Sequence, residues 1–134
     1  MIYNPNLLLI LSSSSFIGTS MYGLYRKNDL CRIDFVSALA SMIYWMDPTN
    51  KNKRVIDIFF ANFATISFFL HGHKYLTPHR KLIGYTTFGY MVSFFMLSCM
   101  TYKMKCRKWY YFHFLFHTFV TGSKILVYNS NVIM

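Results

Sequence analysis

The sequence predicts an all-α fold, a polytopic bundle of about five transmembrane helices that forms a single membrane domain over residues 1–134. Hydrophobic residues make up 54% of the chain and charged residues only 13%, about half the charged share of a typical soluble domain. Five apolar stretches are separated by short segments that carry nearly all of the Lys and Arg. These stretches do not alternate apolar with polar residues, which argues against membrane strands closed into a barrel.

The apolar stretches predict helices at about 6–25, 33–46, 55–70, 82–102 and 109–128. The first, fourth and fifth have about twenty residues, enough to cross a hydrocarbon core of roughly 30 Å. The second and third would reach only about 21–24 Å as helices. Two interpretations remain for these two: they span with help from snorkelling Lys and Arg, or they form a hairpin buried against the other three.

Local signals support the helix ends. Asp47-Pro-Thr-Asn50 is a turn sequence that ends the second helix, and Pro78 precedes the fourth. The first stretch has no positive charge before it and ends in Arg26-Lys27. We therefore expect a retained helix there and not a cleaved signal peptide.

The net charge of +10 comes from fourteen Lys and Arg against four Asp and no Glu. The basic residues gather between the apolar stretches, which is typical of loops that face anionic lipid head groups, and the pattern disfavours nucleic acid as a partner. We expect an integral, multi-pass membrane protein, and a membrane protein partner or a second copy of the chain is plausible. The basic residues divide almost equally between the two faces, so the orientation is not predicted.

Small and hydroxyl residues predict close helix packing. Asn62 is expected to hydrogen-bond across helices. The packing residues are Ser12–Ser15, Ser37, Ser41, Ala61, Thr65, Gly84 and Gly89.

Four polar residues are predicted to lie at one depth, on the side of the membrane where the N-terminus lies. Ser41 is near the end of the second helix, Asp57 near the start of the third, and His113 and His117 in the first two turns of the fifth. His113 and His117 are one turn apart, so both could hold one metal ion. A second interpretation places these histidines at the lipid interface, with Asp57 paired to Arg54 or capping its helix.

The opposite side holds other ionisable groups. Lys124 and Asp34 lie toward that side and could pair inside the bundle. His71, His73 and His79 end the predicted third helix and line the loop before the fourth. We expect solvated side chains there more than a metal site.

The three motifs resemble those of the membrane hydrolase superfamily that contains alkaline ceramidases and the progestin and adipoQ receptors. Its pattern is Ser-x-x-x-His in the second helix, Asp early in the third, and His-x-x-x-His in the last. Ser41-Met-Ile-Tyr-Trp45, Asp57 and His113-Phe-Leu-Phe-His117 look similar. The resemblance implies zinc held by histidines, with Asp57 assisting a metal-bound water and Ser41 the oxyanion.

The chain departs from that pattern in two ways. Position 45 is Trp where the family has its first zinc ligand, and five helices replace seven. A catalytic zinc normally has three protein ligands plus water. The sequence therefore favours a non-catalytic membrane protein that acts through helix packing with a partner, or a degenerate hydrolase relative, with no cofactor. The alternative is a zinc-dependent, ceramidase-like lipid amide or ester hydrolase with Asp57 and Ser41 as catalytic residues and His113 and His117 as metal ligands.

Overall fold

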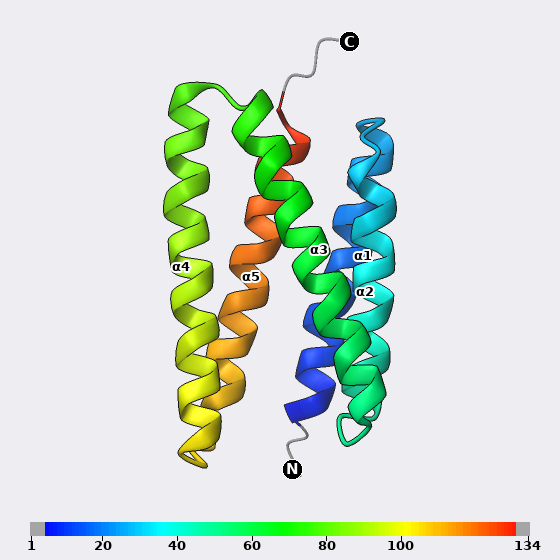
Figure 1. Cartoon of the computed structure of the whole chain (residues 1–134), viewed down its shortest axis with the longest axis vertical. Helices are drawn as coiled ribbons and strands as arrows, with labels where there is room; N and C mark the ends of the chain where they lie inside the picture. The colour runs from blue at the N-terminus through cyan, green and yellow to red at the C-terminus, as the bar shows by residue number, and fades with distance from the viewer. Residues whose placement is uncertain (1–4, 131–134) are drawn as a thin grey trace.

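The computed structural model describes residues 5–130, which form five antiparallel helices that run side by side along one long axis (Figure 1). This confirms the all-α fold class. Neighbouring helices are joined by short turns at alternate ends of the bundle (Figure 1). The helices are α1 (Pro5–Tyr25), α2 (Leu30–Met46), α3 (Lys51–Tyr75), α4 (Pro78–Lys103) and α5 (Trp109–Tyr128).

The third helix is longer than the sequence indicated. It has 25 residues, because the polar segment from Lys51 to Arg54 is helical and the helix continues through His71 to Tyr75. The side chain of Asn50 caps its start by accepting hydrogen bonds from the amides of Asn52 and Lys53. The sequence left open whether this stretch crosses a bilayer, and as a 25-residue helix it is long enough to do so.

Two helices end in the same way. After α1, the Asn28 amide donates to the Gly23 carbonyl and the Lys27 amide to the Leu24 carbonyl. The residues after α4 repeat this pattern, and in both turns a lysine (Lys27 or Lys105) takes the left-handed conformation, with φ of 54° and 55°. These are Schellman turns in which lysine stands where glycine is usual. Both lysines thus lie at the C-terminal end of a helix, where a cation is favoured.

Within residues 5–130, three helices are long and apolar enough to cross a membrane: α1 from Asn6, α3 and α4. The sequence had singled out the first, fourth and fifth stretches. The second helix is still short, with 17 residues. The fifth has 20 residues but is not one of these three, and polar residues such as His113, His117 and Lys124 lie within it.

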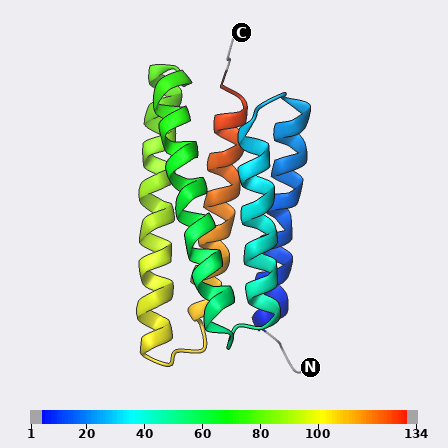
Figure 2. The same ribbon diagram turned by 45° about the vertical axis from the view of Figure 1, so that its right-hand side comes forward.

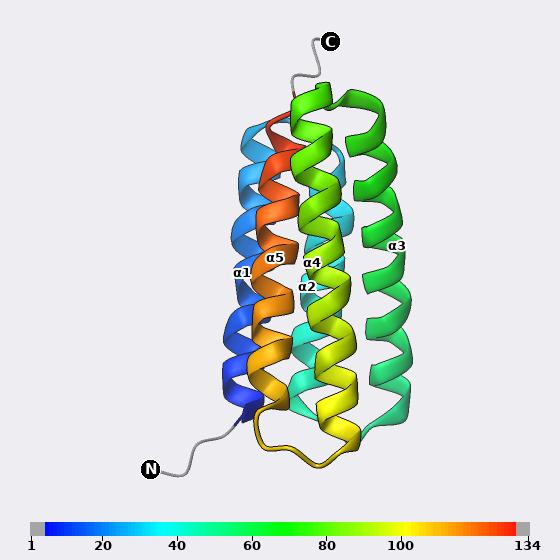
Figure 3. The same ribbon diagram turned by 90° about the vertical axis from the view of Figure 1, so that its left-hand side faces the viewer.

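The helices pack unequally. α1 packs on both α2 and α5, and α4 packs along α5. α3 packs mainly on α2 and meets α4 and α5 over little of its length. It runs obliquely, from beside α2 at its start to the α4 side at its end (Figure 2), and it lies at the edge of the bundle in Figure 3. Few residues of α3 and α4 are buried: they are Ala64, Phe68, Gly72, Met91 and Ser98.

The close approach between helices occurs at Gly23, which the sequence did not single out. A Cβ at this position would stand 2.4 Å from the Tyr128 ring, so only glycine lets α5 approach α1 here. Gly89 has open space around it. The expected cross-helix bond of Asn62 is also wrong, because its amide donates to the carbonyl of Ile58 in the same helix.

Candidate functional site: a polar interior and an interhelical cavity

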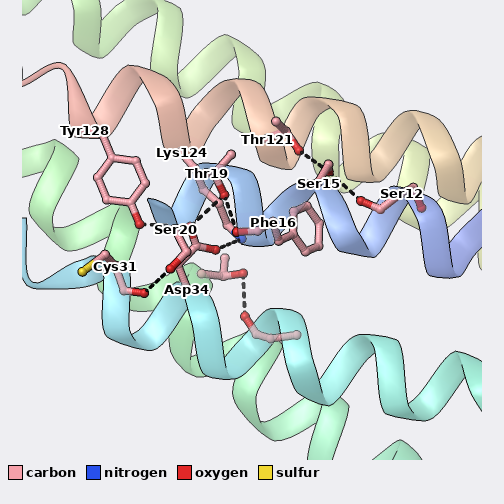
Figure 4. A network of polar contacts seen from close by, with 12 residues as sticks. Ser12, Ser15, Phe16, Thr19, Ser20, Cys31, Asp34, Thr121, Lys124 and Tyr128 are labelled. Atoms are coloured by element: carbon pink, nitrogen blue, oxygen red, sulfur yellow. Dashed lines mark hydrogen bonds and ion pairs between the residues drawn. The ribbon is translucent and has the colours of Figure 1, made fainter. Parts of the chain in front are cut away.

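Asp34 is the centre of the buried polar network (Figure 4). Its side chain is fully buried and accepts from three donors: Lys124 Nζ at 2.5 Å, Thr19 Oγ1 at 2.8 Å and the Tyr128 hydroxyl at 2.9 Å. These donors come from α1 and α5, so one carboxylate ties three helices together. The sequence expectation that Asp34 and Lys124 pair inside the bundle is confirmed.

Aromatic rings complete the surroundings of Lys124. Its ammonium lies 3.9 Å from the centre of the Phe16 ring and 5.8 Å from that of Phe68. A cation against ring faces is attracted by their quadrupoles. The charge is therefore compensated on two sides, which is what a buried ion pair needs to be tolerated.

Further hydroxyl contacts lie along α1. The Ser13 hydroxyl is 3.0 Å from that of Ser41 on α2, and Ser20 donates to the Cys31 carbonyl at 2.8 Å. Toward α5, Ser15 lies 3.3 Å from Thr121 (Figure 4). The serine-rich segment of α1 thus packs as predicted, and its side chains bond to both neighbouring helices.

An interhelical cavity of about 410 Å³ lies between α3, α4 and α5, and Phe16, Ser37 and Ser41 complete its wall. Most of its wall is apolar. One end lies beside Asp57, and the other beside His73 and Lys81. Sixteen residues of α3 separate Asp57 from His73, which corresponds to about 24 Å along the helix.

The four predicted site residues all line this cavity: Ser41, Asp57, His113 and His117. The Ser41 hydroxyl lies 3.0 Å from Ser13 Oγ on α1. The two histidine rings lie with their centres 4.8 Å apart. All four side chains therefore belong to the wall of one cavity.

Each histidine already has a hydroxyl partner on its Nδ1 atom. His117 Nδ1 is 2.7 Å from Ser12 Oγ, and His113 Nδ1 is 3.2 Å from Ser98 Oγ. These serines belong to α1 and α4, so the histidines join α5 to both neighbours. The Nε2 atom of each ring remains as the nitrogen that could bind a metal.

Trp45 occupies the position that the resemblance assigns to the first zinc ligand. Its ring packs edge-on against His113 at 5.2 Å and stacks with Trp109 at 6.0 Å, measured between ring centres. Residue 45 thus does face the histidine pair. An indole N–H is a donor only and cannot ligate a metal. Within the described part of the chain its Nε1 is buried without a hydrogen-bond partner.

The donors present do not fit the zinc site that the resemblance implies. Among residues 5–130, no three His, Cys, Asp or Glu side chains are grouped so that they could hold one metal ion. His113 and His117 supply two nitrogens, and Trp45 adds none. A catalytic zinc site with three protein ligands is therefore incomplete in this donor set.

Asp57 does not play the structural roles considered for it. α3 begins six residues earlier, at Lys51, and Asn50 caps it, so Asp57 is not the cap. Within the described residues the ion pairs are Lys53–Asp47 and Lys124–Asp34, and Arg54 does not pair with Asp57.

The other histidines lie at the opposite end of α3. His71 is 3.4 Å from the Asn28 side chain, and His73 Nδ1 is 2.6 Å from the Tyr85 hydroxyl. His71 and His73 belong to the last turns of α3 and not to a loop. His71 and His73 therefore each have a protein partner, whereas His79 lies in the first turn of α4.

No protein-family model, no curated protein and no solved structure matches this chain. The likeness to the ceramidase and adipoQ receptor superfamily therefore rests on the three short motifs alone.

Proposed function

We propose that the chain is a multi-pass integral membrane protein without catalytic activity, which works through the packing of its helices in the bilayer with a membrane partner or a second copy. The observation that carries this proposal is the distribution of polarity. Charged and hydroxyl side chains such as Asp34, Lys124 and Ser13 are buried and bonded, whereas most large apolar side chains of α3 and α4 are exposed. This arrangement suits a lipid solvent and is the reverse of a soluble bundle.

Exposed hydroxyls on α4 support the proposal. Thr86 and Ser93 are two of these side chains, and each donates to the carbonyl four residues earlier in its own helix, at 2.9 and 2.8 Å. A hydroxyl bonded in this way needs no water. In hydrocarbon, where an unmade hydrogen bond is costly, this is the arrangement that lets a polar side chain face lipid.

Membrane extraction tests this proposal. We expect the expressed chain to stay in the membrane pellet after washing at alkaline pH with carbonate, and to dissolve only with detergent. A peripheral protein serves as the control and should be released by the same wash. Release of this chain into the supernatant without detergent would contradict the proposal.

A second candidate function is the zinc-dependent lipid amide or ester hydrolase. It is favoured by one observation: Ser41, Asp57, His113 and His117 line the same interhelical cavity. Asp57 and Ser41 would then be the groups that take a proton and donate to an oxyanion. The incomplete set of metal ligands weighs against this candidate, so we place it second.

Zinc content separates the two candidates. We expect the detergent-purified wild-type protein to hold no stoichiometric zinc, and the Trp45→His variant to gain it, because residue 45 contacts His113. The gain should disappear in a Trp45→His/His113→Ala/His117→Ala variant. About one zinc per wild-type chain, lost in His113→Ala/His117→Ala, would favour the hydrolase and justify assays on ceramides and acyl esters.

A further inference from the structure

We propose that the interhelical cavity binds one acyl chain of an anionic phospholipid, whose head group is held by Lys81 at the turn between α3 and α4. This inference rests on the proposed insertion of the chain in a bilayer. It adds a ligand, an orientation and a lysine that the motifs around Ser41, Asp57 and the histidine pair do not involve.

The first support is the chemistry of the cavity wall. Over most of its length the wall consists of apolar side chains from three helices, including Phe69, Phe88 and Val92. Its extent along α3, about 24 Å, suits an extended hydrocarbon chain. Apolar cavities of several hundred Å³ with a few polar groups at their ends are typical ligand sites.

The second support is the charge at the Lys81 end. Lys81 lines the cavity and is half-buried in the first turn of α4. Lys74 and Arg80 lie close to it in the sequence, and no acidic residue follows Asp57 anywhere in the chain. Arg80 donates to the Asn129 carbonyl at 2.7 Å, whereas no acceptor within residues 5–130 lies within hydrogen-bonding distance of the Lys81 ammonium. A phosphate would supply that acceptor.

The third support is the charge elsewhere on the wall. Asp57 stands at the far end and would repel an anionic head group there. Lys124 also lines the cavity, but its ammonium is paired with Asp34. Lys81 is thus the cation left to receive a phosphate. Its position at the start of a helix that is apolar enough to cross a membrane places it at head-group depth.

The test measures lipid retained by the whole chain. The protein is reconstituted into vesicles of equimolar phosphatidylglycerol and phosphatidylcholine, re-extracted in mild detergent, and weighed by native mass spectrometry. We expect a phosphatidylglycerol adduct in excess over phosphatidylcholine. Lys81→Gln should lower that excess about fivefold, the effect of one lysine at an anionic surface, and Lys103→Gln at the other end of α4 should not change it.

A second pair of variants tests the acyl chain. Gly84 lines the cavity, and a Cβ there would meet only Leu126 and Leu76 at ordinary contact distances of 3.6 and 3.8 Å. Gly84→Phe should therefore fill the space and reduce adducts of both lipids. Gly89→Phe on the same helix is the control, because Gly89 has open space around it and does not line the cavity.

The outcomes distinguish this inference from the proposed function. Equal effects of Lys81→Gln and Lys103→Gln, or no lipid adduct on the wild type, would overturn the inference, as would unchanged adducts in Gly84→Phe with helix content intact. If Gly84→Phe does not fold, the lysine pair still decides. A chain washed out of the vesicles at alkaline pH would instead overturn membrane insertion itself.

Discussion

At the scale of single residues, the ion pair between Asp34 and Lys124 is the contact whose disruption we expect to lower the free energy of unfolding most. Both side chains are buried, and Asp34 has no access to solvent. Removing one partner leaves an uncompensated charge in a low-dielectric interior, which typically costs about 3–5 kcal/mol. Removing both avoids that cost.

We therefore expect Lys124→Met to lower the free energy of unfolding by about 3–5 kcal/mol. The double variant Lys124→Met/Asp34→Asn should lose clearly less, because no charge is left buried. Unfolding in mixed micelles with increasing dodecyl sulfate measures both. A single variant as stable as the wild type would show that the pair is not buried as described.

Gly23 offers a second test at the same scale. Because Tyr128 is buried and its hydroxyl is bonded to Asp34, the ring cannot yield to a methyl group at position 23 without breaking that bond. Gly23→Ala should cost about 1–3 kcal/mol, as overpacking usually does. Gly18→Ala in the same helix is the matched control. It has open space and should gain up to about 1 kcal/mol from helix propensity. Equal stability of the two variants in the micelle titration would contradict the close approach of α1 and α5.

At the scale of elements, the turn between α2 and α3 is held by Asp47. Its carboxylate accepts from Lys53 Nζ at 3.1 Å and from the Thr49 hydroxyl at 3.0 Å. The hydrogen bond from Lys53, followed by that from Thr49, holds the pKa of Asp47 below its usual value of 3.8. The turn therefore gains stability from the ionised form, which is the form present at neutral pH.

The pH dependence of stability follows from the lowered pKa of Asp47. A lowered folded-state pKa gives stability that is fully present above pH 3.8 and is lost as the pH falls through the lower folded value. We expect the wild type to lose thermal stability in this acidic window more steeply than Asp47→Asn. The effect should be small and should weaken with salt, because the group is exposed. Parallel melting curves for the two proteins would show that the Lys53 contact does not persist in solution.

Part of the site could be predicted from helix order alone. Antiparallel helices place Ser41, Asp57 and His113 at one depth, and the i, i+4 spacing places His117 beside His113. The pairing of Asp34 with Lys124 followed from the same order. The hydroxyl partners of the histidines, Ser12 and Ser98, could not be predicted, because they depend on how each helix is rotated about its axis.

The full length of α3 also could not be predicted from the hydropathy pattern. An apolar stretch ends where charged residues begin, whereas a helix ends where its backbone hydrogen bonds end. Lys51–Arg54 and His71–Tyr75 are polar turns that extend the apolar part of α3 at both ends. Such turns are suited to the head-group region, where snorkelling side chains reach water.

At the scale of the whole molecule, the order of the helices predicts which turns share one side of a membrane. Five antiparallel helices put the α2–α3 and α4–α5 turns at one end of the bundle, and the α1–α2 and α3–α4 turns at the other (Figure 1). If the bundle spans a bilayer, each pair of turns faces one compartment.

The most direct measurement labels single cysteines in sealed membranes with a maleimide that cannot cross the bilayer, in a variant whose native cysteines are replaced by serine. We predict that Thr49→Cys and Lys105→Cys react from one side, and that Asn28→Cys and Thr77→Cys react only from the other. Detergent should make all four reactive. Labelling of all four from one side of intact membranes would contradict the account.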